Sequence, residues 1–512
     1  MFSTERIIRR HTATEAHNRL SHQPFHANVT RRKSTSDIGR QKMAFLPTLR
    51  KAATLMFTPE TAISRAPNTW RSIRAIILSS WFNVLLVFIP ISWAINFALP
   101  NQHSLIFVLT FFAIIPLAKL LAFATDELSI RVGQTLAGLL NATLGNAVEL
   151  IVSIIALTKC ELTIVQSSLV GSILSNLLLV LGMCFFAGGM RFSEQGFGQS
   201  AVQLNSSLLT ISVIAVLLPG AFNMALQGQS TYNAASTYDN ILKTSHGVAI
   251  ILLFIYGSYL VFQLFSHKAL YDDSGADIQE TKVYEGQNPW LQLRLYRRKN
   301  AKLVQSPRPT GDEEAASNPI VPAEGTDPER RSASTEDTDP EVETYMSVPV
   351  SLGLLVVVTV LVAVTAEFLV DSINGLTESG AINKEFVAVI LLPIVGNAAE
   401  HVTAVTVSVK DKLTLSLGVA VGSSIQIALF VIPFMVTLAW IMGKRLTLLF
   451  DPLESIVLFL SVLTVNYVVQ DGKSNWLEGM VLMCLYLILA VTFWFYPGTS
   501  LTEMFVNCRG AE

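Results

Sequence analysis

Two copies of a short motif place a carboxylate and an amide inside apolar segments of the chain. The first copy, GNAVELIVSIIAL at residues 145–157, contains Asn146 and Glu149, and the second, GNAAEHVTAVTVSV at residues 396–409, contains Asn397 and Glu400. In each copy the carboxylate stands three positions after the amide, so in a helix they share one face. An ionisable side chain in the centre of a membrane helix costs about 2.5–3.5 kcal/mol, so it usually faces a partner, an ion or a water-filled cavity. We therefore interpret both copies as parts of one polar site.

The two copies belong to a longer internal repeat with an offset of 251 residues. The offset continues downstream through four matched pairs: Lys159 and Lys410, Leu162 and Leu413, Gly171 and Gly422, Ser172 and Ser423. A short match can arise by chance, but its continuation inside a second hydrophobic half makes chance a poor explanation. The sequence predicts two related halves.

Composition indicates an all-α polytopic membrane protein. Apolar residues make up 51% of the chain and charged residues 14%, whereas soluble domains carry about 25% charge. Eleven stretches approach the roughly 20 apolar residues that a membrane-spanning helix needs, and we expect about 11 transmembrane helices. The net charge of −2 provides no bulk attraction to nucleic acid.

The elements that position the two motifs divide into five regions. Residues 1–74 form a basic tail with 14 Lys/Arg against 4 Asp/Glu, which we expect to be disordered and cytosolic. Residues 75–265 hold an extra helix and a first repeat, 266–347 an acidic, Pro- and Ser-rich cytosolic linker, 348–496 a second repeat, and 497–512 a short C-terminal tail. In the basic tail, Ser34 and Thr35 follow three basic residues. A regulatory kinase is one interpretation, and an unmodified basic tail is the favoured one.

The two motif-bearing helices must cross the membrane in opposite directions. They are the third and the eighth predicted spans, near residues 134–158 and 384–409, and an odd step separates them. This order predicts two inverted five-helix repeats preceded by one extra N-terminal helix, with the ion site near the midplane where broken helices meet. Gly145 and Gly396, directly before the Asn residues, are suitable positions for the breaks.

The motif GNA-x-E, present twice and followed by His401 in the second copy, resembles that of the cation/proton exchanger (CAX) family, the calcium/proton antiporters of the cation/calcium exchanger superfamily, in their fungal vacuolar form. The resemblance covers about residues 75–496 apart from the linker. It implies a secondary antiporter that moves Ca²⁺ from the cytosol into an acidic organelle in exchange for H⁺ by alternating access. It also implies a location in the vacuolar membrane and no cofactor beyond the transported ions.

Calcium chemistry accounts for the residue types at the predicted site. Ca²⁺ takes six to eight oxygen ligands, and the carboxylates of Glu149 and Glu400 would neutralise its charge. Candidates for the remaining oxygens are Asn146, Asn397, Ser172, Ser175, Asn176, Ser423, Ser424 and Gln426. Close packing of small residues explains the Gly-Ser pairs equally well. The resemblance favours Ser175 and Gln426, which occupy matching positions of the repeat.

Three further ionisable residues are candidates for proton coupling or for the access path: His401, Glu127 and Glu367. His401 has no counterpart in the first copy, where Leu150 stands, and it borders the same helix face. We expect it to couple protons together with Glu149 and Glu400, the alternative being a packing role between helices. Glu127 and Glu367, near helix ends, serve either as access-path carboxylates or as interfacial caps.

The rival functional classes fit less well. The sequence holds no HExxH, GxSxG or GxxxxGK[ST] motif, so neither a metalloprotease, a serine hydrolase nor an ATP-driven pump is indicated, and we do not expect an enzyme. A sodium-coupled exchanger, a broader exchanger that also carries Mn²⁺ and, less favoured, an ion channel remain as alternatives.

Overall fold

The computed structural model describes residues 67–227, 234–267, 270, 278–284, 344–378, 380 and 382–498. Nearly all of the predicted basic tail, most of the linker and most of the C-terminal tail lie outside these residues. The predictions made for those three regions, including the kinase site, therefore stay predictions.

The first half of the described chain is helical up to the linker. It comprises α2 (Thr69–Leu78), a 3₁₀ segment (Trp81–Val87), α3 (Phe88–Ala98), α4 (His103–Ser129), α5 (Gln134–Leu144), α6 (Ala147–Thr158), α7 (Leu162–Leu174), a π-helical turn (Ser175–Val180), α8 (Leu181–Gly189), β1 (Gln195–Gly196), α9 (Gln199–Gln227), α10 (Ala234–Val261) and a π-helical turn (Phe262–Ser266).

The second half repeats this plan. It comprises α12 (Val348–Glu378), α13 (Lys384–Phe386), a π-helical turn (Val387–Leu391), α14 (Leu392–Gly396), α15 (Ala398–Ser408), α16 (Leu413–Gln426), a π-helical turn (Ile427–Val431), α17 (Ile432–Ile441), α18 (Pro452–Val468), β2 (Lys473–Ser474) and α19 (Trp476–Phe495).

Length and apolar composition make most of these helices suitable for crossing a membrane. Within the described residues, eight helices qualify, or nine when the bent segment α13–α15 counts as one span. Helices α6 and α18 are apolar but shorter, so the expected number of about 11 is not established. Large side chains such as Phe97, Phe254 and Phe495 are 75%, 74% and 77% exposed. Such exposure suits contact with lipid.

The first membrane span begins differently in the structure from the helix that the sequence predicts. A single helix was expected from about residue 75, but the chain breaks between α2 and the segment that begins at Trp81. At the break Ser80 is extended, and its hydroxyl accepts a hydrogen bond from the amide of Phe82. A serine side chain can hydrogen-bond a nearby backbone amide in place of the helical hydrogen bond. A hydropathy pattern contains no information about this competition.

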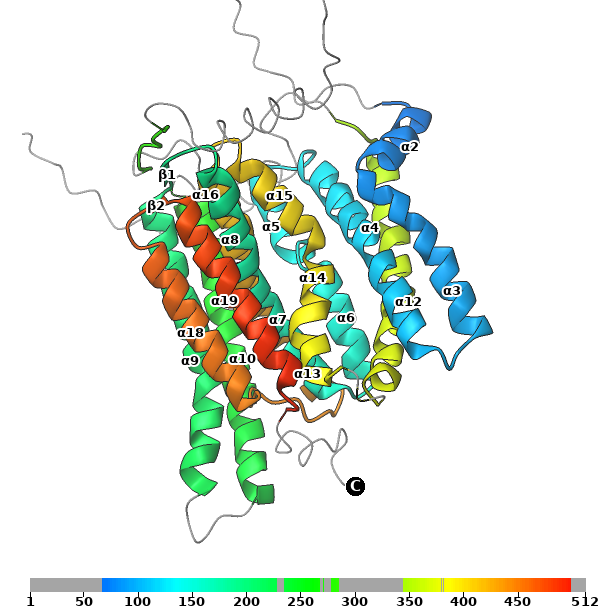
Figure 1. Cartoon of the computed structure of the whole chain (residues 1–512), viewed down its shortest axis with the longest axis vertical. Coiled ribbons are helices and arrows are strands. Elements are labelled where there is room, and N and C mark those ends of the chain that lie inside the picture. The colour runs from blue at the N-terminus through cyan, green and yellow to red at the C-terminus, as the bar shows by residue number, and fades with distance from the viewer. Residues whose placement is uncertain are drawn as a thin grey trace, which may run out of the picture. The chain divides into compact units, whose positions relative to one another are not determined.

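The two motif-bearing segments run in opposite directions, as the predicted inverted repeats require. Figure 1 shows α5 leading down into α6, whereas the chain climbs from α13 through α14 to α15. The second segment bends by 58° between Gly396 and Ala398. The π-helical turns 175–180 and 427–431 also occupy matching positions at the offset of 251 residues. The internal repeat is therefore visible in the backbone.

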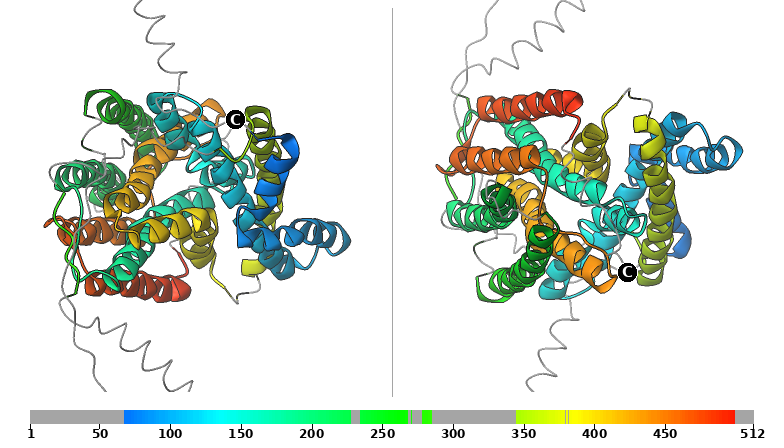
Figure 2. Two further views of the ribbon diagram at one scale, coloured as in Figure 1. Left: turned by 90° about the horizontal axis from the view of Figure 1, so that it is seen from above. Right: turned by 90° about the horizontal axis from the view of Figure 1, so that it is seen from below.

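The helices surround the motif-bearing segments. In the end-on views, α2, α3 and α12 (blue and yellow-green) lie together at one edge, and α9 and α10 (green) lie away from them (Figure 2). Helices α8 and α19 approach closely at two glycines, since a Cβ atom on Gly479 would stand 2.5 Å from the carbonyl oxygen of Gly182. Small residues allow such contacts between membrane helices.

A short part of the linker packs on the end of the helices where α8 stops and α9 starts. Strands β1 and β2 pair antiparallel, and Lys282 forms a bridge with Glu194 just before β1. The Nζ of Lys282 lies 2.7 Å from Glu194 Oε2. This hydrogen-bonded ammonium holds the pKa of the Glu194 carboxyl below its ordinary value.

Candidate ion-binding site

Two helix breaks present the glutamates of the repeated motif. Helix α5 ends at Leu144 and α6 begins at Ala147, so that Asn146 stands in the break and Glu149 in the first turn of α6. In the second repeat Asn397 stands between α14 and α15, and Glu400 lies in the first turn of α15. A helix N-terminus carries a partial positive charge, which stabilises a carboxylate in the first turn.

The two breaks lie against each other. Glu149 is 7% exposed, and its Oε1 atom would stand only 2.5 Å from a Cβ atom added to Gly396. Gly145 in turn faces the Oε1 atom of Gln426, which would stand 3.7 Å from an added Cβ. Gly396 therefore leaves room for the Glu149 side chain of the other repeat, whereas at Gly145 the tight contact is with the carbonyl oxygen of Asn141, 2.7 Å from an added Cβ.

Hydrogen bonds join the two repeats next to Glu149. Ser423 Oγ donates to Asn146 Oδ1 at 2.7 Å, and Asn176 Nδ2 donates to Ser423 Oγ at 3.1 Å. All three residues are buried. Glu400 lies beside Ser423 and within electrostatic range of Glu149. These five residues, all of them candidates from the sequence, thus form one polar group across the repeat interface: Asn146, Glu149, Asn176, Glu400 and Ser423.

Several polar atoms of this group lack a hydrogen-bond partner although they are buried. Those without a partner are Asn146 Nδ2, Glu149 Oε1, Asn176 Oδ1, Asn397 Nδ2 and Oδ1, Glu400 Oε2 and Gln426 Nε2. Buried polar groups are nearly always paired, so this concentration needs an explanation. Four of these atoms are carboxylate or amide oxygens, the ligands that Ca²⁺ prefers. Within the described residues no cluster of three or more His, Cys, Asp or Glu is present, so amides would have to complete a cation site.

A small pocket lies against Glu149. Its wall includes Glu149, Ser153 and Ser172, together with Pro393 and Gly396. Neither Glu400 nor Asn397 lines it. The structure therefore leaves space beside Glu149, and the predicted residue Ser172 borders that space.

His401 lies apart from the connected group. Its Nε2 atom is 3.4 Å from the Oγ atom of Ser175, which belongs to the π-helical turn after α7. A buried tyrosine, Tyr486 of α19, is near the same serine. Ser175 and His401 are thus brought together, and among the hydrogen bonds of the described residues none joins their side chains to Asn146 or Ser423.

Glu127 and Glu367 occupy different environments. Glu127 is 2% exposed and accepts hydrogen bonds from the amides of Tyr345 and Met346 at 3.1–3.2 Å. Glu367 pairs with Lys159 at 3.1 Å and its side chain is 49% exposed. The hydrogen bonds favour the cap interpretation for Glu127, where it fixes the chain ahead of α12. Its predicted access-path role, like that of Glu367, stays a prediction.

The comparisons with known proteins bear on this geometry. The family of sodium/calcium exchanger proteins matches residues 102–265 and 350–495, more than half of the chain. This chain belongs to that family. The exchanger is also 53% identical over 494 residues to the vacuolar calcium ion transporter of Cryptococcus neoformans, covering 91% of this chain and 81% of the relative.

Two further relatives cover most of the exchanger. The Ca²⁺/H⁺ antiporter of a Synechocystis species is 39% identical, with 82% of this chain and 98% of the relative covered. The solved structure of native YfkE is 29% identical, covers 81% of this chain and 100% of its own, and superposes with a TM-score of 0.58. The fold of the helices is therefore shared with solved exchangers.

Sequence reasoning missed one polar group of the exchanger. Glu385, Glu454 and Ser167 lie close together at the end of the helices where α13 begins. A signal was present, because Glu454 is an acid near the start of an apolar segment. The three residues are far apart in the sequence, however, and no motif relates them.

Proposed function

We propose that this exchanger is a secondary active antiporter that moves Ca²⁺ out of the cytosol into an acidic organelle in exchange for H⁺. The observation that carries the proposal is the pairing of two helix breaks, each with a glutamate in the first turn of the following helix, across the interface of two inverted repeats. Relatives named as vacuolar calcium transporters and Ca²⁺/H⁺ antiporters support the choice of ions.

Exchange follows from competition for the same carboxylates. A charged, unpaired carboxylate is costly in a membrane interior, so Glu149 and Glu400 are neutralised either by Ca²⁺ or by protons. Binding of one ligand therefore releases the other. Asn146, Asn397, Ser423 and Gln426 would add oxygens to the carboxylates when Ca²⁺ is bound.

The energetics set the number of protons. One pH unit is worth about 1.4 kcal/mol per proton, and a calcium gradient of about 10³-fold to 10⁴-fold corresponds to roughly 4–5.5 kcal/mol. With a difference of about two pH units, one proton supplies only about 2.7 kcal/mol. At least two protons per Ca²⁺ are required, and two glutamates can hold them.

Alternating access would use the helix breaks as hinges. The pocket borders Glu149 and the α14 part of the bent segment, and a movement of α13–α15 relative to α6 would open the site to one end of the helices while closing it to the other. His401 would pass a proton through Ser175, the residue that its ring contacts.

We place the exchanger in the vacuolar membrane as a multi-pass protein. Helix α10 ends and α12 begins at the end of the molecule where α2 lies (Figure 1). The basic tail and the acidic linker would therefore both face the cytosol. The C-terminal end of α19 would face the organelle lumen.

The nearest alternative is an exchanger driven by Na⁺. Reconstituted vesicles distinguish the two when Ca²⁺ uptake is driven either by an imposed pH gradient or by an imposed Na⁺ gradient of equal energy. Uptake with the pH gradient alone supports the proposal. Uptake that requires Na⁺ contradicts it, and uptake that continues without any counter-gradient would indicate a channel. Competition by Mn²⁺ in the same assay measures whether other divalent cations are carried.

A further inference from the structure

A second pair of buried carboxyl groups lies away from Glu149 and Glu400, where α13, α7 and α18 meet. Glu385 is 6% exposed and Glu454 is 1% exposed. Glu385 belongs to α13, the start of the bent segment that carries Glu400. Glu454 lies in the first turn of α18. The proposed exchange reaction uses neither residue.

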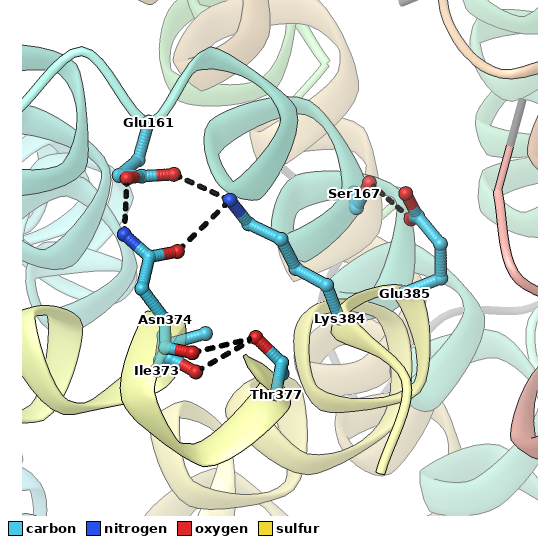
Figure 3. Close-up of polar contacts among 7 residues, drawn as sticks. All are labelled: Glu161, Ser167, Ile373, Asn374, Thr377, Lys384 and Glu385. Carbon is cyan, nitrogen blue, oxygen red and sulfur yellow. Dashed lines mark hydrogen bonds and ion pairs between the residues drawn. The ribbon is translucent and has the colours of Figure 1, made fainter. Parts of the chain in front are cut away.

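The neighbouring cation, Lys384, is paired with residues other than Glu385. Figure 3 shows Lys384 turned toward Glu161 and Asn374, with its Nζ 2.6 Å from Glu161 Oε2 and 3.2 Å from Asn374 Oδ1. Glu385 points to the other side, where Ser167 Oγ donates to its Oε2 atom at 3.0 Å (Figure 3). Lys384 and Glu385 thus tie the start of α13 to two different neighbours.

Glu454 shares its nearest hydroxyl group with Glu385. Both of its carboxyl oxygens are buried, and Ser167, the hydroxyl close enough to act on them, directs its single proton to Glu385 at 3.0 Å. The carboxyl group of Glu454 lies against the carboxyl group of Glu385 and near the hydroxyl of Ser167. Among the described residues no ion pair joins a cation to Glu385 or Glu454.

The remaining titratable groups around the pair are occupied by other contacts. Asp451, the N-cap of α18, accepts hydrogen bonds from the amide of Leu453 at 2.8 Å and from the hydroxyl of Tyr496 at 3.0 Å. The charge of Asp451 acts on both members of the pair, and the three carboxyl groups in turn keep the proton on the Tyr496 hydroxyl. Neither places a donor on Glu454.

A contact between two carboxyl groups is favourable only when one of them holds a proton. Ionised carboxylates are acceptors only, so two of them cannot hydrogen-bond to each other, and they repel strongly where water is excluded. A single shared proton converts the repulsion into a hydrogen bond. We propose that Glu385 and Glu454 form a proton-binding site, separate from Glu149 and Glu400, that ties α13 to α18 while it holds a proton.

The position of the pair gives this proton site a consequence for transport. Helix α13 leads through α14 to Glu400, and the pocket beside Glu149 is lined by α14 and by Ser168, the neighbour of Ser167. Release of α13 from α18 would therefore free the segment that must move during exchange. In the proposed orientation this end faces the acidic lumen, so the pair would respond to lumenal pH. This last step rests on the proposed function, whereas the proton site itself does not.

Thermal unfolding tests the proton site without any transport. The parent is the full chain with Glu149→Gln and Glu400→Gln, purified in detergent without Ca²⁺, which removes the carboxyls of the transport site. A group that binds a proton more tightly in the folded state stabilises the protein at low pH and loses this contribution as pH rises. We expect the Tm of the parent to fall between about pH 5 and about pH 8. With Glu454→Gln added, at least half of this fall should disappear, because the amide donates to Glu385 at every pH.

A matched control is Glu378→Gln, which removes an exposed carboxylate at the end of α12 and should leave the profile of the parent unchanged. If Glu454→Gln does not fold, Glu385→Gln takes its place, since its amide donates to Glu454. Equal pH profiles for the parent and for every folded variant of the pair would overturn the proposal. So would stabilisation of the parent by added Ca²⁺ that Glu454→Gln abolishes, because the pair would then hold the cation and not a proton.

Transport assays test whether the proton site controls the movement of α13 in response to lumenal pH. In the exchanger with no other substitution, Glu454→Gln should change the ratio of Ca²⁺ uptake rates at low and at neutral lumenal pH by more than about two-fold. The KM for cytosolic Ca²⁺ should stay within about two-fold of the value for the unsubstituted protein. An unchanged dependence on lumenal pH would refute the link to gating. Loss of uptake under a pH gradient in the unchanged protein would instead refute the proposed function and leave the Tm result standing.

Discussion

Replacing Gly396 by alanine should weaken Ca²⁺ binding without unfolding the protein. The added Cβ atom would stand 2.5 Å from Glu149 Oε1, whereas ordinary contacts begin at 3.4 Å. The carboxylate must therefore retreat by the difference, about 0.9 Å. Ca²⁺–oxygen distances span only about 2.3–2.6 Å, so this displacement removes Glu149 from any ligand position that it holds. The cost to folding stays small because the displaced atom is the end of a flexible side chain.

The assay is a Ca²⁺ titration of the purified exchanger, with the Tm recorded in parallel. We expect Gly396→Ala to raise the Kd for Ca²⁺ at least about 10-fold, equivalent to about 1.4 kcal/mol, with little change in Tm. Gly418→Ala is the matched control, since it also adds a methyl group to a helical glycine but meets nothing within 4 Å. Wild-type affinity in Gly396→Ala would refute the placement of Glu149 at the site.

Three further predictions address the proton path, the linker and the tail. His401→Ala should lower proton-driven uptake and shift its pH profile while Ca²⁺ binding without a gradient stays near wild type, and an Asn variant that matches wild type in both would show a packing role instead. The lowered pKa of Glu194 means that its contact with Lys282 stabilises the docked linker above the ordinary carboxyl pKa and is lost as pH falls through the lowered value. The hydrogen-exchange protection factors of residues 278–284, taken relative to the intrinsic rates at each pH, should therefore fall in acid for wild type, and Lys282→Met should show that fall already at neutral pH; equal protection of the two proteins at neutral pH would contradict this. Deletion of residues 1–65 should raise the transport rate at equal expression if the basic tail restrains the exchanger, and an unchanged rate would leave it a spacer.

The sequence allowed the principal features of the fold to be predicted because they depend on local patterns. The glycine and asparagine of each motif mark the helix breaks, and the odd number of spans from one motif to the other predicts their opposite directions. The pairing of Ser423 with Asn146 is a contact between residues that both belonged to the predicted site. Their roles in transport stay predictions, since no ion is present.

Other features depend on contacts that no local pattern encodes. The cap that Glu127 forms on Tyr345 and Met346 requires the end of the linker to return to α4. The pair of Glu385 and Glu454 requires two helices from the second repeat to meet beside α7. The predicted first span contained the break at Ser80, because apolar composition continues on both sides of it.

The central claim is that Glu149 and Glu400 together exchange Ca²⁺ for protons. It is tested most directly by Ca²⁺ uptake into vesicles under an imposed pH gradient for Glu149→Gln and Glu400→Gln, with insertion and Tm checked first. Replacing either carboxylate removes a charge from the membrane interior and should not cost insertion energy. We predict that each variant inserts and folds but loses uptake. Uptake at the wild-type rate in either variant would contradict the claim.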